Sequence, residues 1–368
     1  MGLAKTFSAV IVGVRANIVE VEADLSQGLP GLSIVGLPDT ALNEARDRVR
    51  AAVVNSGLKW PNVKTTVSLS PAWLPKRGSG LDLAIALAIL AADGQLPVQE
   101  VGRILSLGEL GLDGMVRPAP GALATALAMR RSSGRVPSAI AAGSSDCLCL
   151  RAVPGLEVIE APSLRALAAR LLGEQEVDPG EDLSAPAFVA LDSSSDARAY
   201  KDMSDVKGQP EAKRALEIAA AGGHHVALLG RAGVGKTLLA ERLPGILPNL
   251  DDEQALEVTS IHQLSGRLDS AGTGLARCAP WFAPHHTASR AAMVGGGSDN
   301  RPSIGMVSLA HHGVLFLDEA AEFEPSVLDA LREPLESGRV TIARAGFQLC
   351  LPADFQLVLA TNPCPCGN

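Results

Sequence analysis

The sequence predicts an α/β protein made of two domains that a linker joins. Residues 1–172 carry segments typical of strands and helices in alternation, which is the order found in α/β domains. Residues 173–200 are acidic, rich in serine and proline and without an apolar period, which predicts a solvated linker. Residues 201–368 again combine apolar, strand-like runs with helix-forming segments. The chain therefore divides into a first domain, a linker and a second domain.

The composition indicates a soluble globular protein. Of the 368 residues, 47% are hydrophobic and 20% are charged, so each domain has enough apolar side chains for its own core. The net charge of −8 would repel nucleic acid, and any DNA binding would depend on local loops. The longest apolar stretch, 83–92, is too short to span a bilayer, so no membrane partner is expected. Six unevenly spaced cysteines do not form the framework of a small secreted protein, which favours a cytoplasmic location.

The first domain is expected to begin with a β-hairpin. Lys5 and the apolar run after it imitate a short signal peptide, but the run continues into residues 18–22, where apolar and polar side chains alternate as in a strand. The domain ends in the helix-forming stretch 164–172, and Ser163 is a suitable N-cap for it. Both ends of the first domain are thus predicted to have regular structure.

The second domain opens around a glycine-rich loop. Helix formers fill residues 210–221, and two glycines end that segment. Residues 226–229 form an apolar strand, and "TLLAERL" at 237–243 has the composition of a helix. The stretch between them fits the pattern G-x-x-x-x-G-K-T and consists of Gly230, Arg231, Ala232, Gly233, Val234, Gly235, Lys236 and Thr237.

This loop has the chemistry of a phosphate site. Its glycines let the backbone curl, so that successive N–H groups point at phosphate oxygens beside the positive end of the next helix. Lys236 would neutralise the β- and γ-phosphates of ATP, and the Thr237 hydroxyl would hold Mg²⁺. A glycine-rich turn with a surface lysine is the alternative, and the flanking strand and helix argue against it.

Two further strands carry polar residues at their carboxyl ends. Residues 314–317 are four apolar residues suited to a central parallel strand, and Asp318 and Glu319 follow them. Asp318 would order the magnesium ion and Glu319 would polarise the attacking water, although an acidic loop after a core strand is a common alternative. The run 355–361 ends at Asn362, which is expected between the other two strand ends, within reach of the attacking water or the γ-phosphate.

These three strand ends together resemble the AAA+ ATPases. The stretches "FAPHHTASRAAMVGGG", "SLAHHGVLFLDEAAEF" and "ATNPCPCG" narrow the likeness to the magnesium-chelatase-related branch, specifically the YifB/ComM group. "GLSIVGLPDTALNEARDRVRAAVVNSG" and "GELGLDGMVRP" resemble the N-terminal domain of that group, which is similar to the proteolytic domain of Lon. By this resemblance residues 230–237 match Walker A, Asp318 and Glu319 match Walker B, and Asn362 matches sensor 1. The family commonly has proline in the Walker A loop where this chain has arginine and alanine.

The resemblance implies a Lon-like (ribosomal S5-type) α/β domain over 1–172 and a P-loop AAA+ domain of three layers, α/β/α, over 201–368. It also implies a homo-oligomer, a hexameric ATP-driven motor, and the ComM branch is tied to DNA branch migration in DNA uptake and recombination. One alternative to the DNA motor is an ATP-dependent protein remodeller of the chaperone or chelatase type. Another alternative is a remnant that binds ATP without efficient turnover. In the family an arginine finger and a helical lid follow the cysteine motif. The chain is therefore expected to be shortened at its C-terminus, and the resemblance implies that it binds ATP but hydrolyses it only weakly.

The first domain departs from Lon at the nucleophile. In Lon a serine follows a P-K-x-G turn and a lysine lies further along the chain. Here Lys76 and Gly78 match the turn, but Ser79 is one place early, and Leu123 or Ala124 stands at the expected lysine position. A serine without a base cannot be activated. We therefore expect a structural or docking module rather than a protease.

Several histidines are adjacent in sequence, and these pairs are His224/His225, His285/His286 and His311/His312. Adjacent side chains diverge on strands and on helices, so such a pair seldom chelates one metal ion. Loop or core-edge positions are the preferred interpretation. His285, His286 and Arg290 belong to a glycine-rich stretch and are candidates for contacts with DNA or a partner.

The cysteines form two kinds of pair. Cys147 and Cys149 alternate with leucines, so at least one of them is expected to be buried as a small apolar side chain. Cys364 and Cys366 lie in a turn that contains proline and glycine, and C-x-C is half of a four-cysteine zinc clip. Family members supply the other half further along, so a zinc site is expected only in a longer form.

Overall fold

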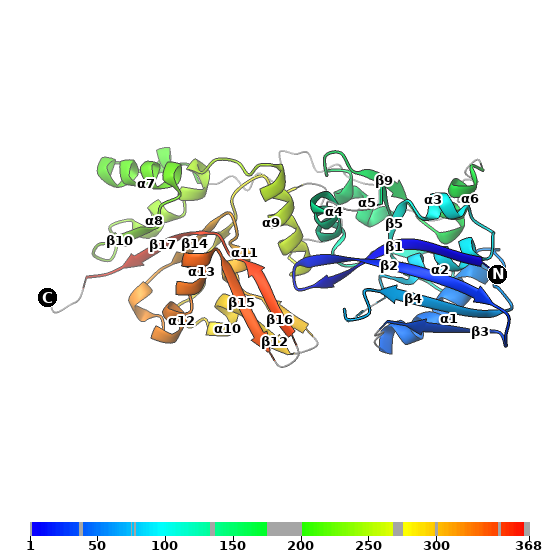
Figure 1. Cartoon of the computed structure of the whole chain (residues 1–368). Helices are drawn as coiled ribbons and strands as arrows, with labels where there is room; N and C mark the ends of the chain where they lie inside the picture. The colour runs from blue at the N-terminus through cyan, green and yellow to red at the C-terminus, as the bar shows by residue number, and fades with distance from the viewer. Residues whose placement is uncertain are drawn as a thin grey trace. The chain divides into compact units, whose positions relative to one another are not determined.

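Two compact units make up the computed structural model of the chain, which Figure 1 shows. The structure describes residues 2–36, 40–74, 76, 79–132, 137–174, 201–267, 275–298, 301–344 and 347–363. Unit 1 contains the described residues up to 174, and unit 2 contains those from 201 onward. Most of the predicted linker lies outside the described residues, which stop at 174 and resume at 201.

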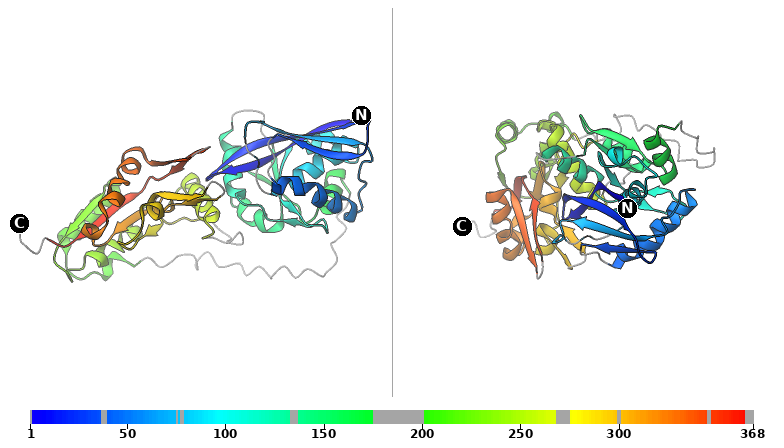
Figure 2. Two further views of the ribbon diagram at one scale, coloured as in Figure 1. Left: turned by 90° about the horizontal axis from the view of Figure 1, so that it is seen from below. Right: turned by 45° about the vertical axis from the view of Figure 1, so that its right-hand side comes forward.

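A seven-stranded mixed sheet forms the centre of unit 1, in the order β3-β4-β2-β1-β5-β8-β9. Its strands are β1 (Gly2–Val12), β2 (Arg15–Ser26), β3 (Gly31–Val35), β4 (Lys64–Ser70), β5 (Ile104–Leu107), β8 (Ala139–Ala142) and β9 (Glu157–Glu160). The predicted hairpin is confirmed, because β1 and β2 pair antiparallel from Gly2 opposite Leu25 to Val12 opposite Arg15. Figure 2 shows this long hairpin in dark blue. A small separate ladder joins β6 (Glu109–Leu110) to β7 (Val116–Arg117).

The helices of unit 1 pack around a core that the second helix dominates. They are α1 (Thr40–Asn55), α2 (Asp82–Ala92), α3 (Val98–Val101), α4 (Ala122–Arg131), α5 (Ser144–Leu150) and α6 (Leu164–Leu172). All residues of α2 are buried, and its apolar side chains belong to the same core as those of β1 and β2. This explains the apolar stretch 83–92 as a core helix. None of the described helices is long and apolar enough to cross a membrane.

Polar contacts fix the helices of unit 1 at defined places. Asp82, in the first turn of α2, accepts two hydrogen bonds from the Arg48 guanidinium of α1, with Nε–Oδ2 at 2.9 Å and Nη2–Oδ1 at 3.2 Å. Burial raises the pKa of Asp82 to about 6 in spite of the Arg48 guanidinium, so the desolvation of this carboxylate outweighs its ion pair. The predicted N-cap of α6 is confirmed, because the Ala166 N–H donates to Ser163 Oγ at 3.2 Å.

A parallel four-stranded sheet forms the centre of unit 2, in the order β10-β17-β14-β11. Its strands are β10 (Val226–Leu229), β11 (Trp281–Phe282), β14 (Val314–Leu317) and β17 (Gln356–Thr361). All of β14 is buried, as its unbroken apolar sequence predicts. Figure 1 shows α7 (Pro210–Gly222) and α8 (Lys236–Ala240) in green beside these strands, and both helices contribute side chains to the core that covers them. The α/β fold class predicted from the sequence is confirmed.

The remaining elements of unit 2 include the 13-residue helix α9, several short helices and two β-hairpins. The helices are α9 (Asp252–Leu264), α10 (Arg290–Val294), α11 (Met306–Leu309), α12 (Pro325–Asp329) and α13 (Arg332–Ser337). The hairpins pair β12 (Gly295–Ser298) with β13 (Arg301–Ile304) and β15 (Arg339–Arg344) with β16 (Phe347–Pro352). The helix predicted for 237–243 is shorter, because Pro244 cannot donate to the Ala240 carbonyl and a 3₁₀ helix takes over at Leu243–Ile246.

Candidate functional site

The carboxyl ends of β10, β17 and β14 meet at one edge of the parallel sheet. Because β17 lies between the other two strands, the residue that follows it, Asn362, stands between the ends of β10 and β14. A cavity of about 330 Å³ opens at this edge. Its lining residues are Ala232, Gly233, Gly235, Lys236, Thr237, Leu238, Asp318, Glu319, Ala360, Thr361 and Asn362. This is the place where open α/β sheets bind their ligands.

The glycine-rich loop between β10 and α8 needs two of its glycines for their backbone conformation. Gly233 has a φ of 81° and Gly235 a φ of 90°, values that side chains with a Cβ seldom adopt. Gly235 is followed directly by α8, so the free N–H groups of the first helical turn border the cavity. The loop is also held from outside, since Gln209 Nε2 donates to the Val234 carbonyl at 2.6 Å.

The ammonium group of Lys236 connects the loop to the central strand. Its Nζ donates to the carbonyls of Gly230 at 2.6 Å and Arg231 at 3.1 Å, and to Asn362 Oδ1 at 2.9 Å. A single cationic group thus lies between the loop and the tip of β17, lining the cavity. An anion in the cavity would compete for the same N–H donors, as a phosphate does in a P-loop.

Oxygen donors suited to Mg²⁺ lie next to this lysine. The Thr237 hydroxyl donates to Asp318 Oδ2 at 2.8 Å, and both side chains line the cavity. Hydroxyl and carboxylate oxygens are the ligands that Mg²⁺ prefers, and in P-loop sites the ion takes one or two of them together with water and phosphate oxygens. The residues present therefore fit a Mg²⁺ ion that arrives with a nucleotide.

Glu319 follows Asp318 in a left-handed conformation, with a φ of 50°. Its carboxylate is half-exposed, and Oε2 lies 3.6 Å from His286 Nδ1. A second cavity, of about 430 Å³, adjoins the first, because Thr237, Asp318 and Glu319 line both. His285 and His286 belong to its wall, so two of the residues predicted for DNA or partner contacts lie beside the acidic end of β14.

The structure brings most of the predicted site residues together. Gly233, Gly235, Lys236 and Thr237 line the first cavity with Ala232, Asp318, Glu319 and Asn362. Gly230, Arg231 and Val234 lie outside its lining and act through their carbonyls, which accept hydrogen bonds from Lys236 and Gln209. Cys364 and Cys366, the predicted half of a zinc clip, lie outside the described residues.

Two contacts at the site could not be predicted from the sequence. Gln209 precedes α7 and has a φ of 55°, which turns its amide toward the glycine-rich loop. The "GQP" turn before a helix is its only sequence signal, and many turns share it. The approach of His286 to Glu319 joins two segments far apart in the sequence, and no local pattern predicts such a pair.

The residues that resemble the Lon turn are tied into unit 1. Ser79 Oγ donates to the Glu109 carboxylate, and the Lys76 ammonium donates to the Pro71 carbonyl. Lys76 is fully buried, and this burial lowers its pKa. Leu123, at the position where a base was sought, is buried in α4.

Comparison with known proteins identifies the family. A family model described as magnesium chelatase, subunit ChlI, matches residues 202–368, and another described as subunit ChlI of Mg-chelatase matches residues 21–138. An uncharacterized protein of Mycobacterium tuberculosis is 47% identical over 368 residues, all of this chain and 70% of its own length. YifB of Escherichia coli is 43% identical over 369 residues, all of this chain and 69% of its own. Competence protein ComM of Haemophilus influenzae is 41% identical over 368 residues, all of this chain and 70% of its own.

The likeness to Lon is partial. Lon protease 2 of Bacillus subtilis is 30% identical over 186 residues, which cover 45% of this chain and 33% of the protease. The YifB and ComM matches, in contrast, extend over the whole chain. On these similarities the chain belongs to the YifB/ComM group of the magnesium-chelatase-related AAA+ proteins.

Proposed function

We propose that unit 2 binds ATP with Mg²⁺ and hydrolyses it as a P-loop ATPase. The observation that carries the proposal is the convergence of Lys236, Thr237, Asp318 and Asn362 on one cavity at the carboxyl edge of a parallel sheet. The three strands that deliver these side chains are parallel neighbours, so the arrangement depends on the whole sheet.

Each residue has a role that follows from its place. The N–H groups of the loop and of the first turn of α8 bind phosphate oxygens, and Lys236 neutralises the β- and γ-phosphates. Thr237 and Asp318 hold the Mg²⁺ ion, which neutralises charge on the phosphate oxygens when bound. Glu319 accepts a proton from the attacking water. Asn362, at the tip of β17, orients that water or the γ-phosphate.

We propose further that the ATPase drives work on DNA. The support is membership in the group that contains competence protein ComM, together with His285 and His286, which lie beside the acidic end of β14. Arg290, at the start of α10, belongs to the same glycine-rich stretch of sequence. In this proposal the protein is cytoplasmic and assembles into a hexamer. A protein remodeller of the chelatase type is the second candidate, because the family also includes magnesium-chelatase subunit ChlI.

Nucleotide binding tests the first proposal. Lys236→Ala removes the only side-chain cation among the described residues that line the cavity. It is expected to weaken the binding of a fluorescent ATP analogue at least about tenfold, because the phosphate charge loses its partner. Lys207→Ala, at an exposed position of the same unit, is the matched control and leaves the affinity unchanged. Equal affinities of the wild type and Lys236→Ala would overturn the proposal.

DNA dependence tests the second proposal. We expect binding to forked DNA with a logarithmic affinity that falls linearly with the logarithm of the salt concentration, because lysine and arginine contacts to phosphate release counterions. DNA should also raise the rate of ATP turnover. A chain that binds ATP but shows neither a salt slope nor stimulation by DNA favours the protein remodeller.

A further inference from the structure

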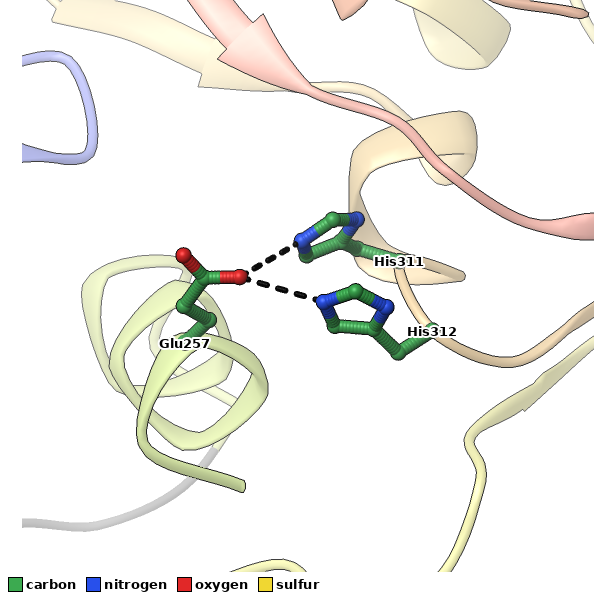
Figure 3. Close-up of side chains that lie close together, drawn as sticks. All are labelled: Glu257, His311 and His312. Atoms are coloured by element: carbon green, nitrogen blue, oxygen red, sulfur yellow. Dashed lines mark hydrogen bonds and ion pairs between the residues drawn. The ribbon is translucent and has the colours of Figure 1, made fainter. Parts of the chain in front are cut away.

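Unit 2 contains a cluster of nitrogen and oxygen donors outside the lining of the nucleotide cavity. Glu257 of α9 faces His311 and His312, which lie in the turn before β14, and Figure 3 shows both imidazoles directed at its carboxylate. Glu257 Oε2 lies 3.1 Å from His311 Nε2 and 3.1 Å from His312 Nε2. The three side chains are largely buried, with exposed fractions of 19%, 6% and 17%. These donors sit at the amino end of β14, opposite the end that carries Asp318 and Glu319.

The backbone explains why two adjacent histidines face the same way. His312 has a φ of 57°, in the left-handed region, and this breaks the alternation or helical rotation that separates neighbouring side chains. The two rings consequently lie almost on top of one another, with centroids 3.8 Å apart and an interplanar angle of 35°. The conformation is held by hydrogen bonds from the His312 N–H to the Asp354 carbonyl and from the Gln356 N–H to the Gly313 carbonyl. A strained backbone kept in place by its surroundings is typical of functional sites.

We propose that Glu257, His311 and His312 form a binding site for a divalent transition-metal ion of the Zn²⁺ class. Two imidazoles and one carboxylate are a donor set that zinc sites use, with a fourth position open to water. Metal–ligand bonds of about 2.0 Å in a tetrahedron place the ligand atoms about 3.3 Å apart, and the two distances to Glu257 Oε2 are close to that value. All three ligand atoms lie within 4.8 Å of one another. An ion would therefore need only a small adjustment of side chains that already converge.

Metal binding would change which nitrogen of the His311 ring carries the proton. The Asp354 N–H donates to His311 Nδ1 at 3.1 Å, so without a metal His311 carries its proton on Nε2 and donates it to Glu257. Metal binding at Nε2 moves this proton to Nδ1 and gives up the Asp354 contact, a small loss against a set of metal–ligand bonds. His312 Nδ1 lies 3.9 Å from Asp354 Oδ2, which is beyond hydrogen-bond distance, so this carboxylate is a charged neighbour of the ring without a hydrogen bond to it. A bound metal ion would thus change the hydrogen bonding of Asp354, which lies just before β17.

The donor set separates this site from the Mg²⁺ site. Imidazole suits zinc, copper and nickel, whereas Mg²⁺ prefers oxygen ligands such as Thr237 and Asp318. The proposed site is therefore expected to bind Zn²⁺ or Co²⁺ without nucleotide and to ignore millimolar Mg²⁺. A bound ion would join α9 to the turn before β14 with metal–ligand bonds in place of two hydrogen bonds.

Metal titration of the full chain tests the proposal. The background is Cys364→Ser/Cys366→Ser, so that these thiolates cannot supply the metal signal, and no nucleotide is present. We expect one equivalent of Zn²⁺ to bind by calorimetry and Co²⁺ to give the visible absorption of a tetrahedral site without a thiolate charge-transfer band. His312→Asn and Glu257→Gln should each weaken binding at least about tenfold, since each removes one of three ligands. Thermal unfolding without metal establishes that each variant is folded.

The control variant is His285→Asn, which changes an adjacent histidine pair that has no part in the cluster and should leave the metal affinity unchanged. Absence of Zn²⁺ and Co²⁺ binding in the Cys364→Ser/Cys366→Ser background would overturn the proposal. Binding that neither His312→Asn nor Glu257→Gln weakens would overturn it as well, because the ion would then lie elsewhere.

Discussion

At the scale of single residues, Asp146 shows how a buried carboxylate couples stability to pH. It lies in the first turn of α5, fully buried, and its Oδ2 accepts a hydrogen bond from the Ala119 N–H at 3.0 Å. Its Oδ1 has no partner among the described residues. Burial raises the pKa of Asp146 to about 6, and the Ala119 hydrogen bond offsets only part of this effect.

The sign of the pH effect follows from that shift. A folded-state pKa above the unfolded value stabilises the protein fully below about pH 4, and this stabilisation is lost as the pH rises through about 6. Asp146→Asn removes the cost of charging the buried group and is expected to raise the free energy of unfolding at pH 8 by up to about 3 kcal/mol. Urea unfolding at pH 5 and pH 8 measures it. Asp47→Asn, at an exposed position of α1, is the control, and an unchanged pH slope in Asp146→Asn would contradict the assignment.

A substitution of Glu319 should slow ATP hydrolysis without weakening ATP binding. Glu319→Gln keeps the size and the hydrogen bonding of the side chain but cannot accept the proton of the attacking water. Single-turnover hydrolysis of labelled ATP is expected to slow by about 10² or more, while the affinity for ATP is retained. Glu322→Gln, an exposed neighbour in the same segment, should hydrolyse ATP like the wild type. Equal rates in both variants would remove Glu319 from the proposed mechanism.

The sequence identifies residues whose role follows from local spacing. Asp318 directly follows the strand-like run 314–317, and Lys236 comes at the end of the glycine-rich loop that follows the run 226–229. The parallel sheet then brings both residues to one cavity. Gln209 and the His311/His312 pair were not assigned to sites, because their contacts depend on a positive φ that non-glycine residues seldom adopt. The rule that adjacent histidine side chains diverge holds for the regular backbone of helices and strands. His312 has a left-handed backbone conformation, so the rule does not apply to it.

At the scale of elements, the glycine-rich loop and the end of α7 offer a matched comparison. Gly235 and Gly223 both have positive φ, and an added Cβ would meet no atom closer than 3.8 Å at either position. Alanine at each is therefore expected to cost about 1 kcal/mol of stability for conformational reasons alone. Only Gly235→Ala should also weaken nucleotide binding, by about tenfold, because the N–H groups of its loop would no longer point into the cavity. Thermal unfolding and nucleotide titration of both variants measure this, and equal losses of affinity would contradict it.

In unit 2 most elements were predicted closely, including the helix over 210–221, which corresponds to α7 (Pro210–Gly222), and one helix was predicted too long. The bounds of β10 and β14 agree with the apolar runs 226–229 and 314–317. β14 is buried and has apolar residues along its whole length, as expected of a central parallel strand, whereas β10 lies at the edge of the sheet and is partly exposed. The helix after the loop was predicted too long, since composition favoured helix through Leu243 while Pro244 prevents the last turn. Intrinsic helix propensity says little about where a neighbouring proline ends a helix.

At the scale of the whole molecule, the tryptophans report on the two units separately. Trp281 is the only tryptophan of unit 2 and stacks on Phe316 with ring centroids 5.3 Å apart, whereas Trp60 and Trp73 belong to unit 1. If the units unfold independently, ATP with Mg²⁺ at 100 times its dissociation constant should stabilise only the Trp281 signal, by about 2.7 kcal/mol. Fluorescence-detected unfolding of Trp60→Phe/Trp73→Phe and of Trp281→Phe, with and without nucleotide, measures each unit. Equal stabilisation of both signals would show that the units unfold together.

The place of β17 in the sheet has a consequence for how the protein is made. β10 and β14 do not pair with each other, because β17 lies between them, although it follows both in the sequence. On the ribosome the first two strands emerge long before residues 356–361, so the parallel sheet stays incomplete while more than a hundred residues of unit 2 are being synthesised. The edges of β10 and β14 that pair with β17 then stay unpaired during synthesis. We expect this waiting period, rather than the stability of the finished fold, to limit the yield of the protein in cells.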